Sequence, residues 1–310
     1  MKKKISFIIL PIHIKKNRLD VALTDVLKKY SRSYVKDLIL TNLVMVNNKI
    51  VNIPNKKVFP GDKITIFVID KNIFHIGENI DLNIFYEDYN ILIINKPAGL
   101  VVHPGNGNHH GTLLNALLYR NKNIQYIPRC GIIHRLDKNT TGLIIIAKDI
   151  ITYLRLIDLM KKKEIIRQYQ AFVFGNLTSG DIISAPIMRD INRRIRMMVH
   201  KDGKPSITYY NIIQKFQYYT HLNIQLFTGR THQIRLHMMY IKHPVLGDPV
   251  YKLRNCIPKK IKKKFFFRIQ FCSRQCLHAS HIKFIHPIIH KDMSFYVSIP
   301  DDMMNIIKYL

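Results

Sequence analysis

Tryptophan is absent from this chain of 310 residues, and cysteine occurs only four times. Four cysteines at irregular spacing are too few for a disulfide framework, which favours a reducing compartment and predicts a cytoplasmic protein. No apolar run approaches the roughly 20 residues that a membrane-spanning helix needs, so we expect no membrane span and no membrane partner. The opening M-K-K-K-I-S-F-I-I-L-P lacks a small-residue cleavage site and predicts a first strand rather than a signal peptide.

The cysteines and histidines also support a zinc site poorly. Cys272 and Cys276 precede His278 and His281, but three residues separate the cysteines and no matching pair stands elsewhere. Structural zinc sites usually need four closed ligands. We therefore expect no metal at these residues.

Negative charge is scarce throughout the sequence. Forty-nine Lys and Arg residues stand against 20 Asp and Glu residues, a formal net charge of +29. Such an excess suits a polyanionic partner, of which RNA is the natural candidate. Heavy use of Lys, Asn and Ile also arises from coding bias, so the charge supports this interpretation without establishing it. If phosphate contacts dominate the affinity, binding to RNA should weaken steeply with added salt.

One of these few carboxylates stands between cations just before a predicted strand. Residues 131–149 read G-I-I-H-R-L-D-K-N-T-T-G-L-I-I-I-A-K-D, and the Ile-rich run 143–147 predicts a buried strand entered through a polar turn. Asp137 lies on that approach loop, where Arg135 and Lys138 should keep its carboxylate ionised at neutral pH. A solvated turn or a helix cap is the alternative for a lone Asp. An ionised Asp on a loop carried by a rigid strand is suited to act as a base or a nucleophile.

The string H-R-L-D followed by T-T-G-L-I-I-I-A-K resembles the signature of the RluA-type pseudouridine synthases, which isomerise uridine within RNA. That resemblance implies that Asp137 is the catalytic residue. K-E-I-I-R-Q-Y-Q-A at 163–171 is similar to the second motif of the family, whose Tyr, here Tyr169, packs against the target base. L-F-T-G-R-T-H-Q-I-R-L-H-M at 226–238 is similar to the third motif, whose first Arg, here Arg230, pairs with the catalytic Asp.

Further strings in the same order resemble the family at 94–107, 243–251 and 274–279. The resemblance implies that no cofactor is needed, since the reaction adds nothing and releases nothing. The target nucleotide must swing out of the RNA. Arg135 is our candidate for holding open the space it leaves. Whether Asp137 attacks the sugar, attacks the base or removes a sugar proton stays open.

The glycine-rich run H-P-G-N-G-N-H-H-G at 103–111 is similar to the corresponding segment of family members that act on the large ribosomal subunit. This likeness implies 23S rRNA or its precursor as partner, and the intersubunit stem-loop, helix 69, as substrate. We expect the protein to act as a monomer. A catalytically idle RNA-binding assembly factor and an RNA N-glycosidase are the alternatives.

The first 75 residues form a predicted unit of their own, with a core at 18–68. Two short helices, a hairpin turning at Asn47 and Asn48, and a strand after Pro60 are expected. R-L-D-x-x-L, then S-R-S, then V-x-V-N, resembles the S4 RNA-binding domain, a small α/β fold. That resemblance implicates the basic residues of the helix pair in binding structured RNA, with solvated surface charge as the alternative; they are Arg18, Arg32 and Lys36.

A polar stretch at 70–83 is the predicted linker, and 84–310 the predicted catalytic domain, for an overall α+β fold class. Strands are expected at 91–94, 143–147, 169–174, 221–227 and 294–299, and helices at 112–119, 151–162, 231–241 and 301–310. The family resemblance adds that a central, mostly antiparallel sheet carries the RNA-binding cleft. The basic stretch 188–197, with Arg193 and Arg194, predicts a loop that follows RNA phosphates, or else a disordered solvated loop. A second basic stretch lies at 257–267.

Overall fold

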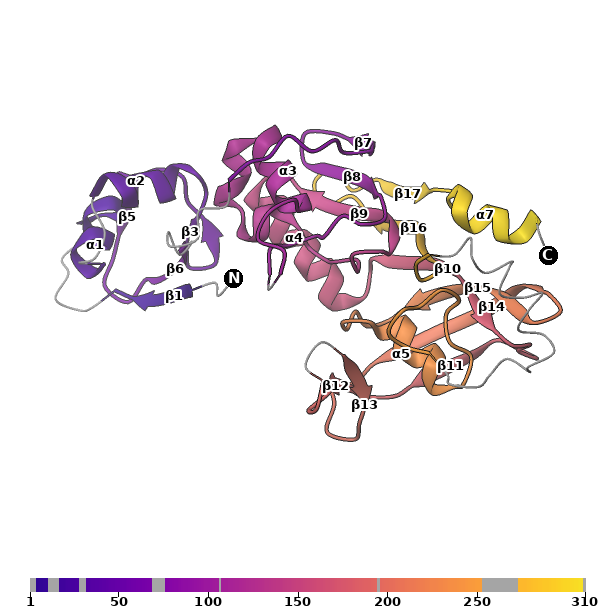
Figure 1. Cartoon of the computed structure of the whole chain (residues 1–310). Helices are drawn as coiled ribbons and strands as arrows, with labels where there is room; N and C mark the ends of the chain where they lie inside the picture. Colours follow the sequence, from indigo (N-terminus) through magenta and orange to yellow (C-terminus); the bar gives the residue numbers. More distant parts are fainter. Residues whose placement is uncertain are drawn as a thin grey trace.

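The computed structural model shows a small unit, drawn in indigo, beside a larger one (Figure 1). The described residues are 4–10, 17–27, 32–68, 76–105, 107–193, 196–252 and 273–308. Among them no helix is both long enough and apolar enough to cross a bilayer. The stretch at 257–267, Cys272 and Arg194 lie outside the described residues.

The small unit combines a sheet of strand order β1-β6-β3-β4 with two helices. Its elements are β1 (Lys4–Ile9), β2 (Asn17–Arg18), α1 (Leu19–Val26), α2 (Arg32–Leu40), β3 (Val44–Val46), β4 (Lys49–Ile50), β5 (Lys57–Val58) and β6 (Lys63–Val68). The helices bury Leu23 and Ile39 in the same apolar cluster as Ile64 of β6. The predicted hairpin is confirmed, because Asn47 and Asn48 have φ of 51° and 64°, as a tight two-residue turn requires.

The large unit is built on a nine-stranded sheet of order β11-β14-β15-β10-β16-β9-β8-β7, with β17 paired to β16. Its strands are β7 (Ile84–Glu87), β8 (Ile91–Lys96), β9 (Thr141–Ala147), β10 (Ile166–Phe174), β11 (Asp181–Ser184), β14 (Ile207–Lys215), β15 (Tyr219–Leu226), β16 (Leu277–Ile285) and β17 (Asp292–Tyr296). Only β9 and β16 pair in parallel among the described strands. The prediction of an α+β fold around a mostly antiparallel sheet is therefore confirmed.

Helices flank this sheet where the sequence predicts them. They are α3 (Leu113–Arg120), α4 (Ile150–Lys162), α5 (Gln233–Tyr240) and α7 (Asp301–Lys308), with short 3-10 turns η1 (Lys122–Tyr126) and η2 (Pro128–Gly131). Asp149 caps α4 by accepting from the Thr152 amide at 2.8 Å, and Lys163, at φ 62°, ends it. Figure 1 places α3 and α4 beside β8 and β9.

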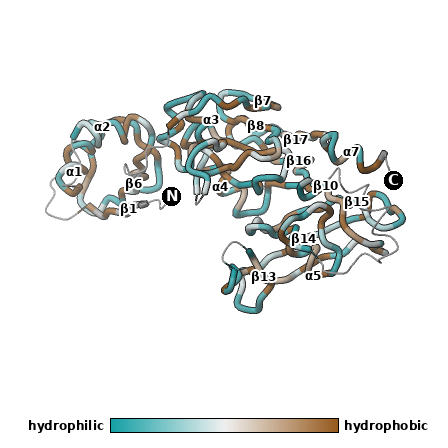
Figure 2. Tube along the Cα trace, in the orientation of Figure 1, coloured by the Kyte–Doolittle hydropathy of each residue, from teal (hydrophilic) through white to brown (hydrophobic). Residues whose placement is uncertain are grey.

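The core lies on both faces of the central strands. Every residue of β9, T-G-L-I-I-I-A, is buried, as expected for a strand covered on two sides. Figure 2 shows apolar trace along β8 and its neighbours. This burial fixes β9, and with it the loop that precedes it.

Three parts of the large unit differ from the sequence expectation. The last strand, β17, ends at Tyr296, earlier than the predicted 294–299. The two ends of the basic stretch 188–197 lie in paired strands, β12 (Ile187–Arg189) and β13 (Met197–Val199), and not in a loop. The end of the predicted linker packs on α3, because the Asn115 side chain donates to the carbonyl oxygen of Ile76 at 2.8 Å.

Candidate active site

A pocket of about 520 Å³ opens between the loop before β9, the start of β10 and the segment that joins β15 to α5. A volume of this size is typical of sites that enclose a small organic group. Asp137 lines it, with 16% of its side chain exposed. The sheet therefore places the predicted catalytic carboxylate at a pocket wall.

Two glycines let the Asp137 loop pass close to the sheet. Gly131 has φ of 75°, and a Cβ there would lie 1.9 Å from the carbonyl oxygen of Ala147. Gly142 has φ of 109°, and a Cβ there would lie 2.2 Å from the carbonyl oxygen of Ala279. Only glycine fits both the backbone angle and the contact at these positions. They fix where the loop leaves and rejoins the sheet.

Lys96, at the end of β8, binds the backbone of the loop that carries Asp137. Its fully buried ammonium donates to the carbonyl oxygen of Lys138 at 3.0 Å. It also donates to the carbonyl oxygens of Pro97 and Leu100, so each N–H has an acceptor. Burial lowers the pKa of Lys96 to about 7, and the charge of Asp137 acts in the opposite direction. Lys96 is thus tied by hydrogen bonds to the residue next to Asp137.

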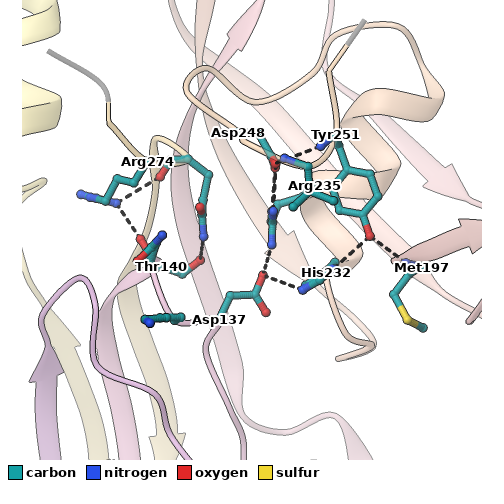
Figure 3. Close-up of polar contacts among 12 residues, drawn as sticks. Asp137, Thr140, Met197, His232, Arg235, Asp248, Tyr251 and Arg274 are labelled. Carbon is teal, nitrogen blue, oxygen red and sulfur yellow. Dashed lines mark hydrogen bonds and ion pairs between the residues drawn. The ribbon is translucent and has the colours of Figure 1, made fainter. Parts of the chain in front are cut away.

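The segment before β16 supports the loop from the other side. Arg274 donates through Nη1 to the carbonyl oxygen of Asn139 at 3.1 Å, and Gln275 donates to the Thr140 hydroxyl at 3.2 Å. Arg274 is itself fixed by Asp302 of α7, with Nε 2.7 Å from the carboxylate. Figure 3 shows Arg274 and Thr140 beside Asp137.

Arg235 of α5 is the cation that pairs with Asp137. Its Nη1 donates to Oδ2 of Asp137 at 2.9 Å, while Nε and Nη2 donate to the two oxygens of Asp248 at 2.6 and 2.9 Å (Figure 3). Burial alone would lower the pKa of Arg235, but the hydrogen bonds to Asp248 and the charge of Asp137 raise it above its usual value. Asp248 thus aims the guanidinium, and the guanidinium orients the Asp137 carboxylate through a charge-assisted hydrogen bond.

His232 and Tyr251 complete the polar surroundings of Asp137. His232 Nε2 lies 3.9 Å from Asp137 Oδ2, and its Nδ1 bonds to the Tyr251 hydroxyl at 2.9 Å (Figure 3). That hydroxyl also accepts from the Met197 amide at 2.9 Å. Burial lowers the pKa of His232, against the effect of Asp137. The imidazole is therefore a neutral neighbour of the carboxylate near pH 7.

Tyr169 of β10 lies on the same pocket wall and is 4% exposed. Burial raises its pKa, so the hydroxyl stays protonated at neutral pH. Its ring packs with Leu136, the residue before Asp137, in one apolar cluster. A flat, neutral ring beside a carboxylate is suited to support a planar base.

Known proteins share both units of this chain. Residues 90–240 match the family model described as RNA pseudouridylate synthase, and residues 17–64 match the S4 domain. The chain is 50% identical, over 94% of its length and 93% of the relative, to ribosomal large subunit pseudouridine synthase D of Buchnera aphidicola subsp. Acyrthosiphon pisum. The chain belongs to the RNA pseudouridylate synthase family.

Other members of the RNA pseudouridylate synthase family agree. The chain is 44% identical, over 94% of its length and 90% of the relative, to the Escherichia coli K12 protein named ribosomal large subunit pseudouridine synthase D. Among solved structures, human RNA pseudouridylate synthase domain containing 4 matches with a TM-score of 0.58 and 21% identity, over 73% of this chain and 92% of that one. That structural likeness supports the fold.

Within this pseudouridine synthase fold, the predicted site residues lie at the pocket, but one predicted contact between them is not made. Asp137, Arg135, Tyr169 and Arg230 all line the pocket. The predicted pairing of Arg230 with Asp137 is wrong, however. Arg230 is exposed and donates from Nε to the carbonyl oxygen of Pro205 at 3.4 Å. The pairing is made by Arg235, five residues further on.

The predicted RNA-binding residues of the small unit are not equivalent. Arg18 and Arg32 both bond to the buried carboxylate of Asp20, at 3.0 and 3.1 Å, and remain about half exposed. Lys36 is exposed on α2 and has no ion pair among the described residues. In the large unit Arg193 is exposed at the β12–β13 turn. Arg18 and Arg32 therefore differ from Lys36 in having a carboxylate partner, and Arg193 differs in belonging to the large unit.

Sequence reasoning missed Arg235, Asp248 and Arg167, all of them buried at or behind the pocket. The signal for Arg235 was a second arginine in G-R-T-H-Q-I-R, four residues after the start of the predicted helix at 231–241. The predicted helix at 231–241 begins later than expected, since His232, at φ 57°, is the residue before α5. That start turns Arg235 towards Asp137. His278 and His281, considered for zinc, bond instead to Thr141 and Gln168.

Proposed function

We propose that this protein isomerises uridines of 23S rRNA to pseudouridine, with Asp137 as its catalytic residue. The observation that carries the proposal is one carboxylate at a pocket wall, which Arg235 orients by a hydrogen bond and which lines the same pocket as Tyr169. The names of the relatives, ribosomal large subunit pseudouridine synthase D, support a large-subunit substrate. Within it, we propose the intersubunit stem-loop, helix 69.

The reaction breaks the bond from N1 to C1′, turns the uracil and joins C5 to C1′, after which C5 loses its proton and N1 gains one. Asp137 is the one carboxylate lining the pocket in the described part of the chain. It therefore supplies both roles that the reaction needs, a group that reacts with or deprotonates the nucleoside and a base for the C5 proton. Arg235, held by Asp248, keeps the carboxylate in one orientation throughout.

Tyr169 and Arg135 would handle the swung-out nucleotide. Stacking of a base on an aromatic ring contributes roughly 1 to 3 kcal/mol, which would hold the detached uracil while it turns. Arg135 is exposed at the pocket, two residues from Asp137, where it can enter the gap in the RNA. Arg230, also exposed at the pocket, would contact the RNA backbone outside it.

The wider surface would bind the surrounding RNA. We propose that residues 1–75 act as an RNA-binding unit through Arg18, Arg32 and Lys36, joined by 70–83 to the catalytic domain at 84–310. The β12–β13 turn with Arg193 would add phosphate contacts. The protein would act in the cytoplasm as a monomer, and its own side chains would suffice without a cofactor.

The test is pseudouridine mapping on 23S rRNA treated with the full-length protein. Asp137→Asn should form no pseudouridine while still binding the RNA. Asp158→Asn, which removes an exposed carboxylate of α4, is the matched control and should modify normally. Unchanged modification by Asp137→Asn would leave the catalytic assignment untenable. Free uracil in the wild-type reaction would instead indicate an N-glycosidase, and no modification by wild type would favour an idle assembly factor.

A further inference from the structure

Arg167 has no counterion, unlike the other buried arginines of the described residues. Arg167, Arg235 and Arg274 are 8%, 4% and 5% exposed. Arg235 and Arg274 each form an ion pair with a carboxylate. Arg167 forms none there, and its buried Nε has no hydrogen-bond partner. A buried cation without a partner is strongly unfavourable, so this position indicates an anion that arrives with the substrate.

Arg167 lines the same pocket as Asp137 and lies two residues before Tyr169 on β10. Residues i and i+2 of a strand share a face and are separated by about 7 Å. Across the pocket wall, a Cβ on Gly229 would lie 3.0 Å from Nη1 of Arg167. The guanidinium therefore reaches from β10 to the Gly229 backbone, one step along the strand from the ring of Tyr169.

His134 adds a second unused donor to this wall. Its Nε2 accepts from the Ile145 amide at 3.1 Å, so a neutral ring carries its proton on Nδ1. Nδ1 is buried and has no hydrogen-bond partner in the described part of the chain. Burial, with a further contribution from Arg167, lowers the pKa of His134 to about 3, so the ring is neutral at pH 7. The wall thus combines one cation, whose Nε has no acceptor among the described residues, with one neutral N–H donor that has none there either.

The anion can be identified from the chemistry of a bound uridine. Uracil and ribose are neutral, whereas the phosphodiesters on either side of the nucleoside carry full negative charge. A guanidinium binds phosphate through two parallel hydrogen bonds and is the side chain best suited to that geometry. The step from Tyr169 to Arg167 is similar to the separation of a base from the backbone of its own nucleotide.

We propose that Arg167 binds a phosphodiester directly attached to the target uridine, inside the pocket, and so anchors the swung-out nucleotide while its base turns. This assignment rests on the proposed function. Arg167 is a positioning residue for the reaction, since it touches the backbone of the substrate and leaves the chemistry to Asp137. Arg135 and Arg230, which are exposed, contact the RNA outside this anchor.

The test is a double-mutant cycle between Arg167→Gln and RNA stem-loops that carry one neutral methylphosphonate. With wild-type protein, neutralising the phosphate 5′ or 3′ of the target uridine should lower kcat/KM about 10- to 100-fold. Arg167→Gln should show a similar loss on unmodified RNA, and little further loss on that methylphosphonate. At a remote phosphate the two losses should multiply. The proposal would be overturned if the loss in kcat/KM from Arg167→Gln and the loss from the methylphosphonate multiplied at both phosphates adjacent to the target uridine.

Two further measurements separate anchoring from a structural role. Because Arg167 forms no ion pair among the described residues, Arg167→Gln should unfold at the same or a higher temperature, whereas loss of a structural contact would lower it. If that variant does not fold, Arg167→Lys replaces it in the cycle, since it keeps the charge but loses the planar fork. Coupling of Arg167 to the O4 atom of uracil, tested with a 4-deoxy base, would mean base recognition and would also overturn the proposal.

The same cycle is measured as binding affinity in the Asp137→Asn protein, where no turnover is needed. If wild type forms no pseudouridine, the proposed function fails, yet the binding cycle still decides the phosphate contact. If wild type is active and the cycle shows independence, only the Arg167 assignment fails.

Discussion

The two units of this protein use opposite arrangements of the same charged groups. In the small unit one buried carboxylate, Asp20, bonds to two half-exposed arginines. In the large unit one buried arginine, Arg235, bonds to two carboxylates, of which Asp248 is fully buried and Asp137 faces the pocket. The first arrangement presents net positive charge to solvent, which suits phosphates. The second presents a single oriented negative charge to a pocket, which suits chemistry on a nucleoside.

The largest effect on stability and activity is expected when Arg235, which bonds to both carboxylates of the large unit, is replaced. Arg235→Met leaves the buried carboxylate of Asp248 without its counterion, although the amides of Val250 and Tyr251 still donate to it, so the free energy of unfolding should fall by about 3–5 kcal/mol. Loss of the bond to Asp137 should also lower kcat/KM about 10²- to 10³-fold. Denaturant unfolding and single-turnover pseudouridine formation measure the two effects.

Arg230→Met is the matched control, because Arg230 belongs to the same segment but is exposed. Its free energy of unfolding should change by less than about 0.5 kcal/mol. If Arg230→Met destabilised the protein more than Arg235→Met did, the assignment of the Asp137 partner would be wrong. Arg235→Lys, which keeps the charge, covers the case in which the methionine variant does not fold.

This pair of arginines also shows what the sequence could and could not predict. The motif strings predicted Asp137, Tyr169 and Arg230 as site residues, and all three line one pocket. They could not say which arginine turns inward, because that depends on where α5 begins. His232 adopts a left-handed backbone conformation just before the helix, and no side-chain pattern in T-H-Q-I-R predicts it. Asp248 could not be linked to Arg235 without the fold.

The fold was predictable to a similar extent. Ile-rich runs such as 143–147 gave central strands correctly, since burial on two faces leaves a continuous apolar signal. β16, which pairs with β9 and β10 at the centre of the sheet, was missed. It buries His278 and Ser280, each 1% exposed, so its apolar alternation is interrupted by polar residues. His278 is tolerated there because it bonds to the Thr141 hydroxyl at 2.8 Å.

The next largest effect on stability is expected when Asp20, which bonds to both arginines of the small unit, is replaced. Asp20→Asn removes the charge that fixes Arg18 and Arg32, and should lower the stability of the small unit by about 2–3 kcal/mol. Although burial alone would raise the pKa of Asp20, its hydrogen bonds to the two arginines lower it. The stabilisation is therefore complete above about pH 4, the unfolded value, and is lost as pH falls through the folded pKa. Asp37→Asn, on the exposed face of α2, should leave stability unchanged in the same melting experiments.

A smaller effect is expected in the pH dependence of stability, which His134 gives to the large unit in a higher pH range than Asp20 gives to the small unit. His134 in the large unit has its pKa lowered to about 3, against about 6.5 when unfolded. The unfolded chain therefore binds the extra proton between these values, and stability falls as pH drops through that window. At pH 5 this amounts to about 2 kcal/mol.

His134→Gln keeps an acceptor for the Ile145 amide but does not titrate. Its free energy of unfolding should therefore decline less than that of wild type between pH 7 and pH 5, by about 2 kcal/mol. Parallel declines for both proteins would mean that His134 is protonated in the folded state.

The smallest effect tests whether Asp20 already neutralises part of the charge offered to RNA. A cation that displaces counterions from RNA contributes about one to the slope of log K against log salt. Lys36 has no carboxylate partner among the described residues, so Lys36→Gln should lower the slope by nearly that amount. Arg32 shares Asp20 with Arg18, so Arg32→Gln should lower it by clearly less. Equal changes would mean that Asp20 orients the arginines without reducing their effective charge, and that the small unit differs from the large one in geometry alone.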